Sequence, residues 1–164
     1  PPGDGLSAVP GVTRIDFYLL PVSEPHGKLS FACRLAEKAW QSGHQVYVNG
    51  SDAAEAEAFD ALLWSFRDTS FVPHRLLGAA GSEAAPVEVG TGETAADHHD
   101  VLINLCAAVP PLFSRFERVA ELVLNDPDAL AASRQRWSFY KDRGYQLQHH
   151  DMQHLRSAGD RDNA

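Results

Sequence analysis

The chain has 164 residues, of which 44% are hydrophobic, and it carries a formal net charge of −8. This length fits one domain with one sizeable core. The acidic balance argues against direct nucleic-acid binding, because nucleic-acid-binding domains usually carry a basic excess. Since no apolar run is long enough to span a bilayer and no secretory signal occurs, we expect a cytoplasmic protein without membrane contact.

The two ends of the chain differ in composition from its middle. Residues 1–12 contain three prolines and three glycines, which predicts a flexible N-terminal extension. The polar residues 153–164 predict a disordered tail. We therefore expect the folded domain over residues 13–152.

The first half of this domain alternates strand and helix patterns. Residues 13–20 predict a strand, followed by a turn region that includes Pro25. Apolar side chains then recur at helical spacing up to Gly43, and residues 45–49 predict a second strand. Asp52, with Glu55 three residues later, predicts the cap of a second helix that buries Phe59. This order predicts a largely parallel sheet with right-handed crossovers.

The second half continues the pattern. Residues 70–73 and 86–89 are strand candidates, and the apolar run at residues 101–105 predicts a central strand buried on both faces. A short helix carrying Phe113 and Phe116 and a strand at residues 119–124 follow. The final elements are a helix at residues 128–143, between a start signal at Asn125-Asp126-Pro127 and a stop signal at Gly144, and an edge strand from Tyr145.

That last helix is the main indication of function. It concentrates basic and aromatic residues in an acidic chain: Arg134, Arg136, Lys141 and Arg143 with Trp137, Phe139 and Tyr140. Arg134, Trp137 and Lys141 are spaced to meet on one helix face. Such a face suits an acidic partner that also carries an apolar group, because arginine binds carboxylates and the ring takes up apolar surface. The alternative is an ordinary docked helix, with its rings in the core and its charges in water.

A second unusual segment lies around Trp64, Phe66 and Phe71. Three large aromatic residues surround a short polar loop there. If Trp64 and Phe71 are exposed, they form an anchor for a protein partner, since interface centres favour aromatic side chains. The alternative is that both rings belong to the core.

Signals for catalysis are weak. Neither a dinucleotide fingerprint nor a phosphate loop follows the first strand. Cys33 and Cys106 lie in apolar segments with no local base, so packing explains them better than catalysis. The histidine clusters at Asp97 to Asp100 and at His149, His150 and His154 lack a recognised metal-ligand spacing. We predict no catalytic residue, cofactor or metal; the alternative is a nucleotide- or phosphate-using enzyme on a Rossmann-like sheet.

An ordered set of segments resembles the chi subunit of bacterial DNA polymerase III, an accessory protein of the clamp-loader complex. The segments are DFYLL, RLAEKAWQSGHQVYV, LLW followed by SFVPH, APVEV, DVLINL and ASRQRWSFYKDRGY, which together cover residues 13 to about 150. The resemblance implies a single α/β domain with an open, mostly parallel, Rossmann-like sheet in three αβα layers. It also implies a non-catalytic adaptor without a bound nucleotide.

The resemblance further implies two protein partners. The psi subunit, which tethers chi to the clamp loader, would bind at Trp64, Phe71, Val72 and Pro73. The acidic C-terminal tail of single-stranded DNA-binding protein would bind at Val123, Arg134, Trp137 and Lys141. Leu130 stands where some members have lysine, so it is left out of the tail site. A helicase is an alternative partner at the psi site.

Overall fold

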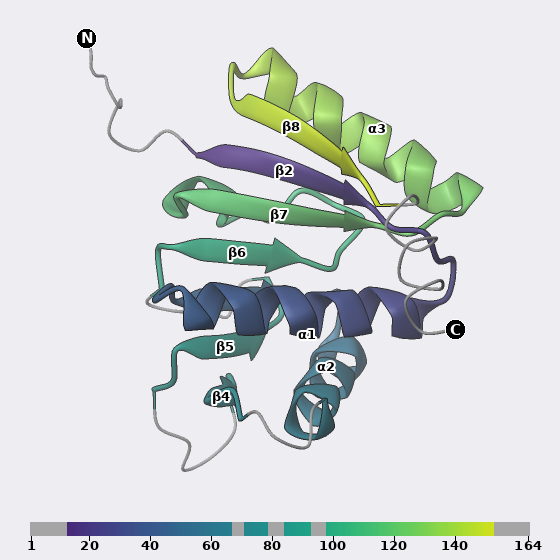
Figure 1. The fold of residues 1–164 in the computed structure, drawn as a ribbon. Coiled ribbons are helices and arrows are strands. Elements are labelled where there is room, and N and C mark those ends of the chain that lie inside the picture. The colour runs from purple at the N-terminus through teal and green to yellow at the C-terminus, as the bar shows by residue number, and fades with distance from the viewer. Residues whose placement is uncertain (1–12, 67–70, 79–83, 93–97, 153–164) are drawn as a thin grey trace, which may run out of the picture.

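The structure, a computed structural model, describes residues 13–66, 71–78, 84–92 and 98–152. Seven strands form one sheet in the order β4-β5-β3-β6-β7-β2-β8, and every pair of neighbouring strands is parallel (Figure 1). The strands are β2 (Arg14–Leu19), β3 (Val46–Asn49), β4 (His74–Leu76), β5 (Val87–Gly90), β6 (Val101–Asn104), β7 (Arg118–Val123) and β8 (Gln146–Asp151). The helices are α1 (Pro25–Gln41), α2 (Ala53–Ser65), the 3₁₀ turn η1 (Phe113–Arg115) and α3 (Pro127–Asp142). The predicted open α/β fold with a parallel sheet is confirmed.

The helices cover the sheet from two sides. Figure 1 shows α1 and α2 in front of the sheet and α3 behind its β8 end. One apolar core joins α1 and α2 to the sheet around Phe59, Val48 and Ile103, and a second joins α3 to the sheet around Phe17, Tyr140 and Phe113. The alternation of side chains along β2 helps to separate the two cores, since Ile15 and Phe17 face α3 while Asp16 lies on the other face.

Local sequence signals explain where the helices begin and end. Asp52 accepts a hydrogen bond from the Glu55 amide at 2.8 Å, and Asp126 accepts one from the Ala129 amide at 2.8 Å. Both are N-caps that satisfy amides left over in the first turn of a helix. Gly144 follows α3 with a φ of +82°, a conformation that glycine adopts without strain. The predicted caps of α2 and α3 and the predicted stop of α3 are therefore confirmed.

Two sequence predictions need correction. Pro25 was expected in a turn, but it begins α1, because a proline fits the first helical position, where no intrahelical donor is needed. The strand expected at residues 70–73 lies instead at His74–Leu76: Phe71 to Pro73 precede it without strand pairing, and residues 67–70 lie outside the described part. Since Pro73 has no backbone N–H to donate to a ladder, the strand begins after it.

The expected extension at residues 1–12 and tail at residues 153–164 both lie outside the described residues. In the part of the chain that is described, no helix combines the length and apolar character needed to cross a membrane.

Candidate protein-binding surfaces

A hollow of about 280 Å³ opens between α3 and β8. We call it the α3–β8 hollow; its lining residues are Phe17, Leu19, Ser133, Arg134, Trp137 and His149. The described residues of this lining include one formal cation and no carboxylate. Its surface can therefore receive an apolar group while Arg134 offers a charged partner for an acid.

Helical spacing brings Arg134 and Trp137 to this hollow, one turn apart on α3. The Trp137 ring packs edge-on against Phe17, with 5.3 Å between ring centroids, and its other neighbour is the His149 ring at 6.3 Å. Trp137 is half-buried and Arg134 is exposed. The indole therefore has one side anchored in the core and another side available, while the guanidinium stays in water.

Arg136 belongs to the interior, although it lies two residues from Arg134. It is 4% exposed, and its Nε donates to Glu121 Oε1 at 3.0 Å. Tyr140 and Asn104 also donate to the Glu121 carboxylate, at 2.6 and 2.8 Å. Burial raises the pKa of Glu121, while the Arg136 charge and the three donors oppose that rise. Of the three basic residues of α3, Arg136 thus holds the helix to β7 and does not serve the surface.

Two residues that the resemblance assigned to the tail site do not line the hollow. Val123 is 1% exposed, and it lines a smaller, separate cavity of about 80 Å³ with Lys28 and Arg136. Lys141 is exposed in the last turn of α3 but is not part of the lining. The structure therefore brings together Arg134 and Trp137 and leaves Val123 and Lys141 apart from them.

Trp64, in the last turn of α2, and Phe71, after that helix, form an exposed aromatic pair. Their exposed fractions are 58% and 56%, the two large exposed apolar side chains of the described residues, and their ring centroids lie 5.3 Å apart. The alternative that both rings belong to the core is wrong. Such a pair in water costs hydration free energy that a protein partner can recover by covering it.

The pair rests on a buried histidine. His74 is 9% exposed and its ring centroid lies 4.6 Å from that of Trp64. Its Nδ1 donates to the Val72 carbonyl at 2.6 Å, and Asp60 Oδ1 lies 3.5 Å from its Nε2. Val72 is buried, so its side chain supports the surface from below, whereas Pro73 is half-buried beside it.

The carboxyl ends of the strands, where an open α/β sheet usually binds its ligand, show another hollow of about 360 Å³. Several polar groups in and beside this hollow already have partners. The Asn49 amide donates to Asn104 at 2.9 Å, Asp52 caps α2, and Lys28 beside the strand ends pairs with Glu55 at 2.9 Å. Burial raises the pKa of the Cys106 thiol at its rim, which opposes a nucleophilic role.

The histidines of the two sequence clusters separate into different surroundings. The His98 ring lies 2.8 Å from the Ala85 carbonyl, His149 lines the α3–β8 hollow, and His150 lies 3.0 Å from Asp16. Asp97 and His154 lie outside the described residues. Within the described ranges, no group of three or more His, Cys, Asp or Glu residues is placed to hold a metal ion.

Comparison with known proteins gives the family. The model of the family "DNA polymerase III chi subunit, HolC" matches residues 12–148, so the chain belongs to that family. A relative from Pseudomonas aeruginosa, named DNA polymerase III subunit chi, is 45% identical over 141 residues, which cover 86% of this chain and 98% of that protein. This membership supports an accessory role in DNA replication.

A solved structure shows the same fold at low identity. The crystal structure of T4 UvsW matches with a TM-score of 0.64 and 9% identity over 88% of this chain and 42% of that chain. This likeness shows the fold alone.

Sequence reasoning did not place four residues of the α3–β8 hollow in a site: Phe17, Leu19, Ser133 and His149. Phe17 and Leu19 alternate along β2 and pair with His149 and Asp151 on β8. This register places the side chains of Phe17, Leu19 and His149 on one face of the sheet. The register itself depends on β8 pairing with β2 across a large separation in sequence. No local signal in the sequence gives that pairing.

Proposed function

We propose that the chain is a non-catalytic adaptor of the replicative DNA polymerase. It links the clamp-loader complex, through the psi subunit, to the acidic C-terminal tail of single-stranded DNA-binding protein. The tail binds in the α3–β8 hollow, and psi covers the Trp64 and Phe71 pair.

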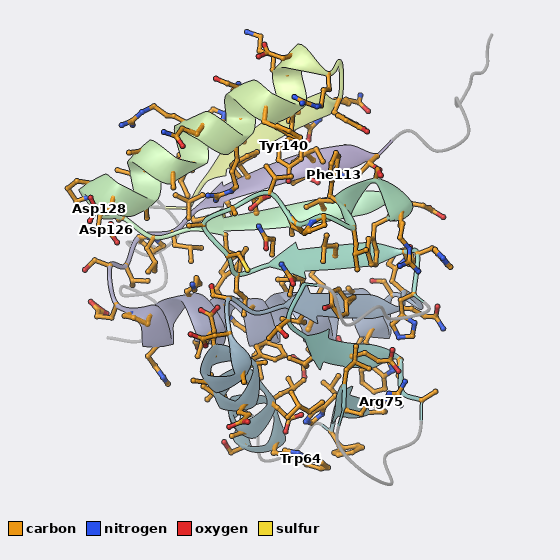
Figure 2. All side chains as sticks on the ribbon, turned by 180° about the vertical axis from the view of Figure 1, so that it is seen from behind. Trp64, Arg75, Phe113, Asp126, Asp128 and Tyr140 are labelled. Atoms are coloured by element: carbon orange, nitrogen blue, oxygen red, sulfur yellow. The ribbon has the colours of Figure 1, made fainter. Side chains whose placement is uncertain are left out.

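The single observation that carries this proposal is the separation of the two surfaces. The aromatic pair lies beside β4 at one edge of the sheet, and the hollow lies beside β8 at the other edge. Six inter-strand steps of about 4.8 Å place these edges roughly 29 Å apart. Figure 2 shows Trp64 at the opposite end of the molecule from Tyr140 on α3. Two partners can therefore bind at once without touching each other.

The chemistry of the hollow suits the end of an acidic tail. Arg134 pairs with the terminal carboxylate or an aspartate, and the apolar wall of Trp137, Phe17 and Leu19 receives the last side chain. One exposed arginine gives a modest, salt-sensitive interaction. Lys141, exposed one turn beyond Trp137, adds to the attraction at longer range.

The chemistry of the aromatic pair suits a folded or folding protein partner. Two adjacent aromatic rings above a buried support supply apolar area with little side-chain freedom to lose on binding. Pro73 widens the same surface, while Val72 acts from beneath it. The psi interaction is thus apolar in character and less dependent on salt than the tail interaction.

The test is a pair of titrations with matched variants. The purified chain is titrated with an acidic, Phe-ended tail peptide and separately with psi. Arg134→Ala should weaken peptide binding by about 2 kcal/mol and leave psi binding unchanged, because it removes one charge-assisted contact. Trp64→Ala should do the reverse. A peptide titration of Arg134→Ala identical to that of the parent, or loss of both partners in either variant, counts against the proposal.

A ternary measurement tests simultaneous binding. The chain saturated with psi should bind the tail peptide with the affinity of the chain alone, since the sites lie at opposite edges of the sheet. Competition between psi and the peptide would contradict the adaptor function even if each binds alone.

A further inference from the structure

We propose that the outer edge of β8 takes up the upstream part of the same acidic tail as an added strand, beside the α3–β8 hollow. This inference rests on the proposed function and extends it, because it states how the peptide main chain is held. The occupant is an acidic peptide with an apolar C-terminal residue.

β8 is the last strand of the sheet, so one of its edges has no neighbouring strand among the described residues. The Met152 amide donates to the Leu19 carbonyl at 2.9 Å, which fixes which residues face β2. In a parallel ladder, the N–H and C=O of one residue point to the same side and alternate along the strand. The backbone N–H and C=O groups of Gln146, Gln148 and His150 therefore point toward β2. Those of Leu147 and His149 point outward, away from the sheet.

No described residue pairs with the outward amides and carbonyls of Leu147 and His149. The strand also lacks the usual protection of an edge, since its sequence QLQHHD contains neither lysine nor proline. Its side chains are exposed at Gln146, Gln148 and His149. An extended peptide can thus approach these backbone groups, which is the geometry of β-strand addition.

His149 joins this edge to the hollow. Its backbone faces outward, whereas its side chain lines the hollow opposite Trp137, at 6.3 Å between ring centroids. A peptide whose last side chain enters the hollow beside these two rings has its upstream residues beside Leu147. Its main chain then runs parallel to β8, in keeping with the rest of the sheet.

Charge favours an acidic occupant at the hollow end of this path. The lining includes Arg134 and no carboxylate, and β8 is neutral from Gln146 to Gln148. Asp151, the one acid of the strand, pairs with Leu19 two residues beyond His149, so it lies past the stretch from Leu147 to His149 that the peptide would follow. An acidic residue of the peptide can therefore lie near Arg134, and the strand pairing makes no demand on the sequence of the other residues.

The experiment uses N-methylated tail peptides on the unaltered full chain. In a peptide paired with β8, every second backbone amide upstream of the last residue points toward β8 and donates to it. Methylation of an amide in this set removes a donor and should weaken binding about tenfold, the equivalent of about 1.4 kcal/mol for one hydrogen bond. Methylation of the other set, whose amides point to solvent, serves as the matched control and should change affinity less than about twofold.

Amide hydrogen exchange gives a second measurement. Peptide binding should slow exchange at Leu147 and His149, while Gln146 and Gln148, which already pair with β2, change little. Equal affinity of all methylated peptides for the chain, or unchanged exchange at Leu147 and His149 with the peptide bound, overturns this inference and leaves the tail site itself intact. A parent peptide that does not bind overturns both proposals. Protection of the same amides by self-association of the chain without peptide also overturns this inference.

Discussion

Arg134 and Arg136 lie on the same helix, and the structure predicts opposite consequences for their removal. Arg136→Met leaves the Glu121 carboxylate buried without its cation and also removes the 2.7 Å hydrogen bond from Arg136 to the Ala107 carbonyl. Breaking one half of a buried ion pair costs about 3–5 kcal/mol. Against a domain stability of about 5–15 kcal/mol, this is a large loss. Arg134→Met removes an exposed side chain, and its stability cost should stay within about 0.5 kcal/mol.

Urea and thermal unfolding followed by circular dichroism measure the difference. At about 2–4 °C per kcal/mol for a domain of this size, Arg136→Met should lower the Tm by roughly 6–20 °C. Arg134→Met should leave the Tm near that of the parent and weaken the tail peptide instead. Adding Glu121→Gln to Arg136→Met should recover about half of the lost stability, because no buried charge is then unpaired. Equal Tm values for the two single variants would refute the assignment of Arg136 to the interior and Arg134 to the surface.

Three further predictions concern other parts of the domain. Trp64→Ala should weaken psi binding by about 3.5 kcal/mol in a titration, because the exposed 58% of Trp64 corresponds to roughly 140 Å² of surface, at about 25 cal/mol per Å². Unchanged affinity would remove Trp64 from that surface. Burial raises the pKa of Asp16, but hydrogen bonds from His150 and Arg118, with the charges of Arg118 and Arg14, bring it below its ordinary 3.8. The stability that ionised Asp16 contributes is present above about pH 3.8 and is lost as the pH falls through the lowered pKa. The Tm of Asp16→Asn should therefore lie below that of the parent at pH 7 and approach it near about pH 2. A difference in Tm that stays constant with pH would contradict this. Burial raises the pKa of Cys33 to about 12 and also raises that of Cys106. Iodoacetamide at about pH 8 should therefore alkylate the unfolded chain much faster than the native chain. Equal alkylation rates, measured by mass spectrometry, would argue against burial of the thiols.

The sequence predicted the elements well where local signals are strong. The apolar run of β6 identified a strand buried on both faces, and Asp126, Pro127 and Gly144 marked the limits of α3. It failed at β4, where three residues of mixed polarity pair only with β5. A short edge strand of this kind carries no periodicity of its own, because its position depends on α2 and β5.

For the candidate sites too, the sequence predicted what local spacing determines and missed what depends on tertiary contacts. Helical spacing placed Arg134 and Trp137 on one face, and that spacing also separates Arg136, which lies about 200° from Arg134 around the helix. The exposure of Trp64 and Phe71 could not be derived from their sequence, since large aromatic residues in the last turn of a helix or just after it are equally suited to a core. His149 was missed because its role depends on the pairing of β8 with β2.

The parallel sheet also has a mechanical consequence. If one partner pulls at the β4 edge and another at the β8 edge, tension runs across the strands and along the hydrogen bonds between them. Links in series carry the same force, so the link with the fewest bonds yields first. The β4 to β5 pairing has three residue pairs, whereas β2 has six with β7 and six with β8. Under such a pull we expect rupture to begin at β4, while the ladder next to the α3–β8 hollow stays intact.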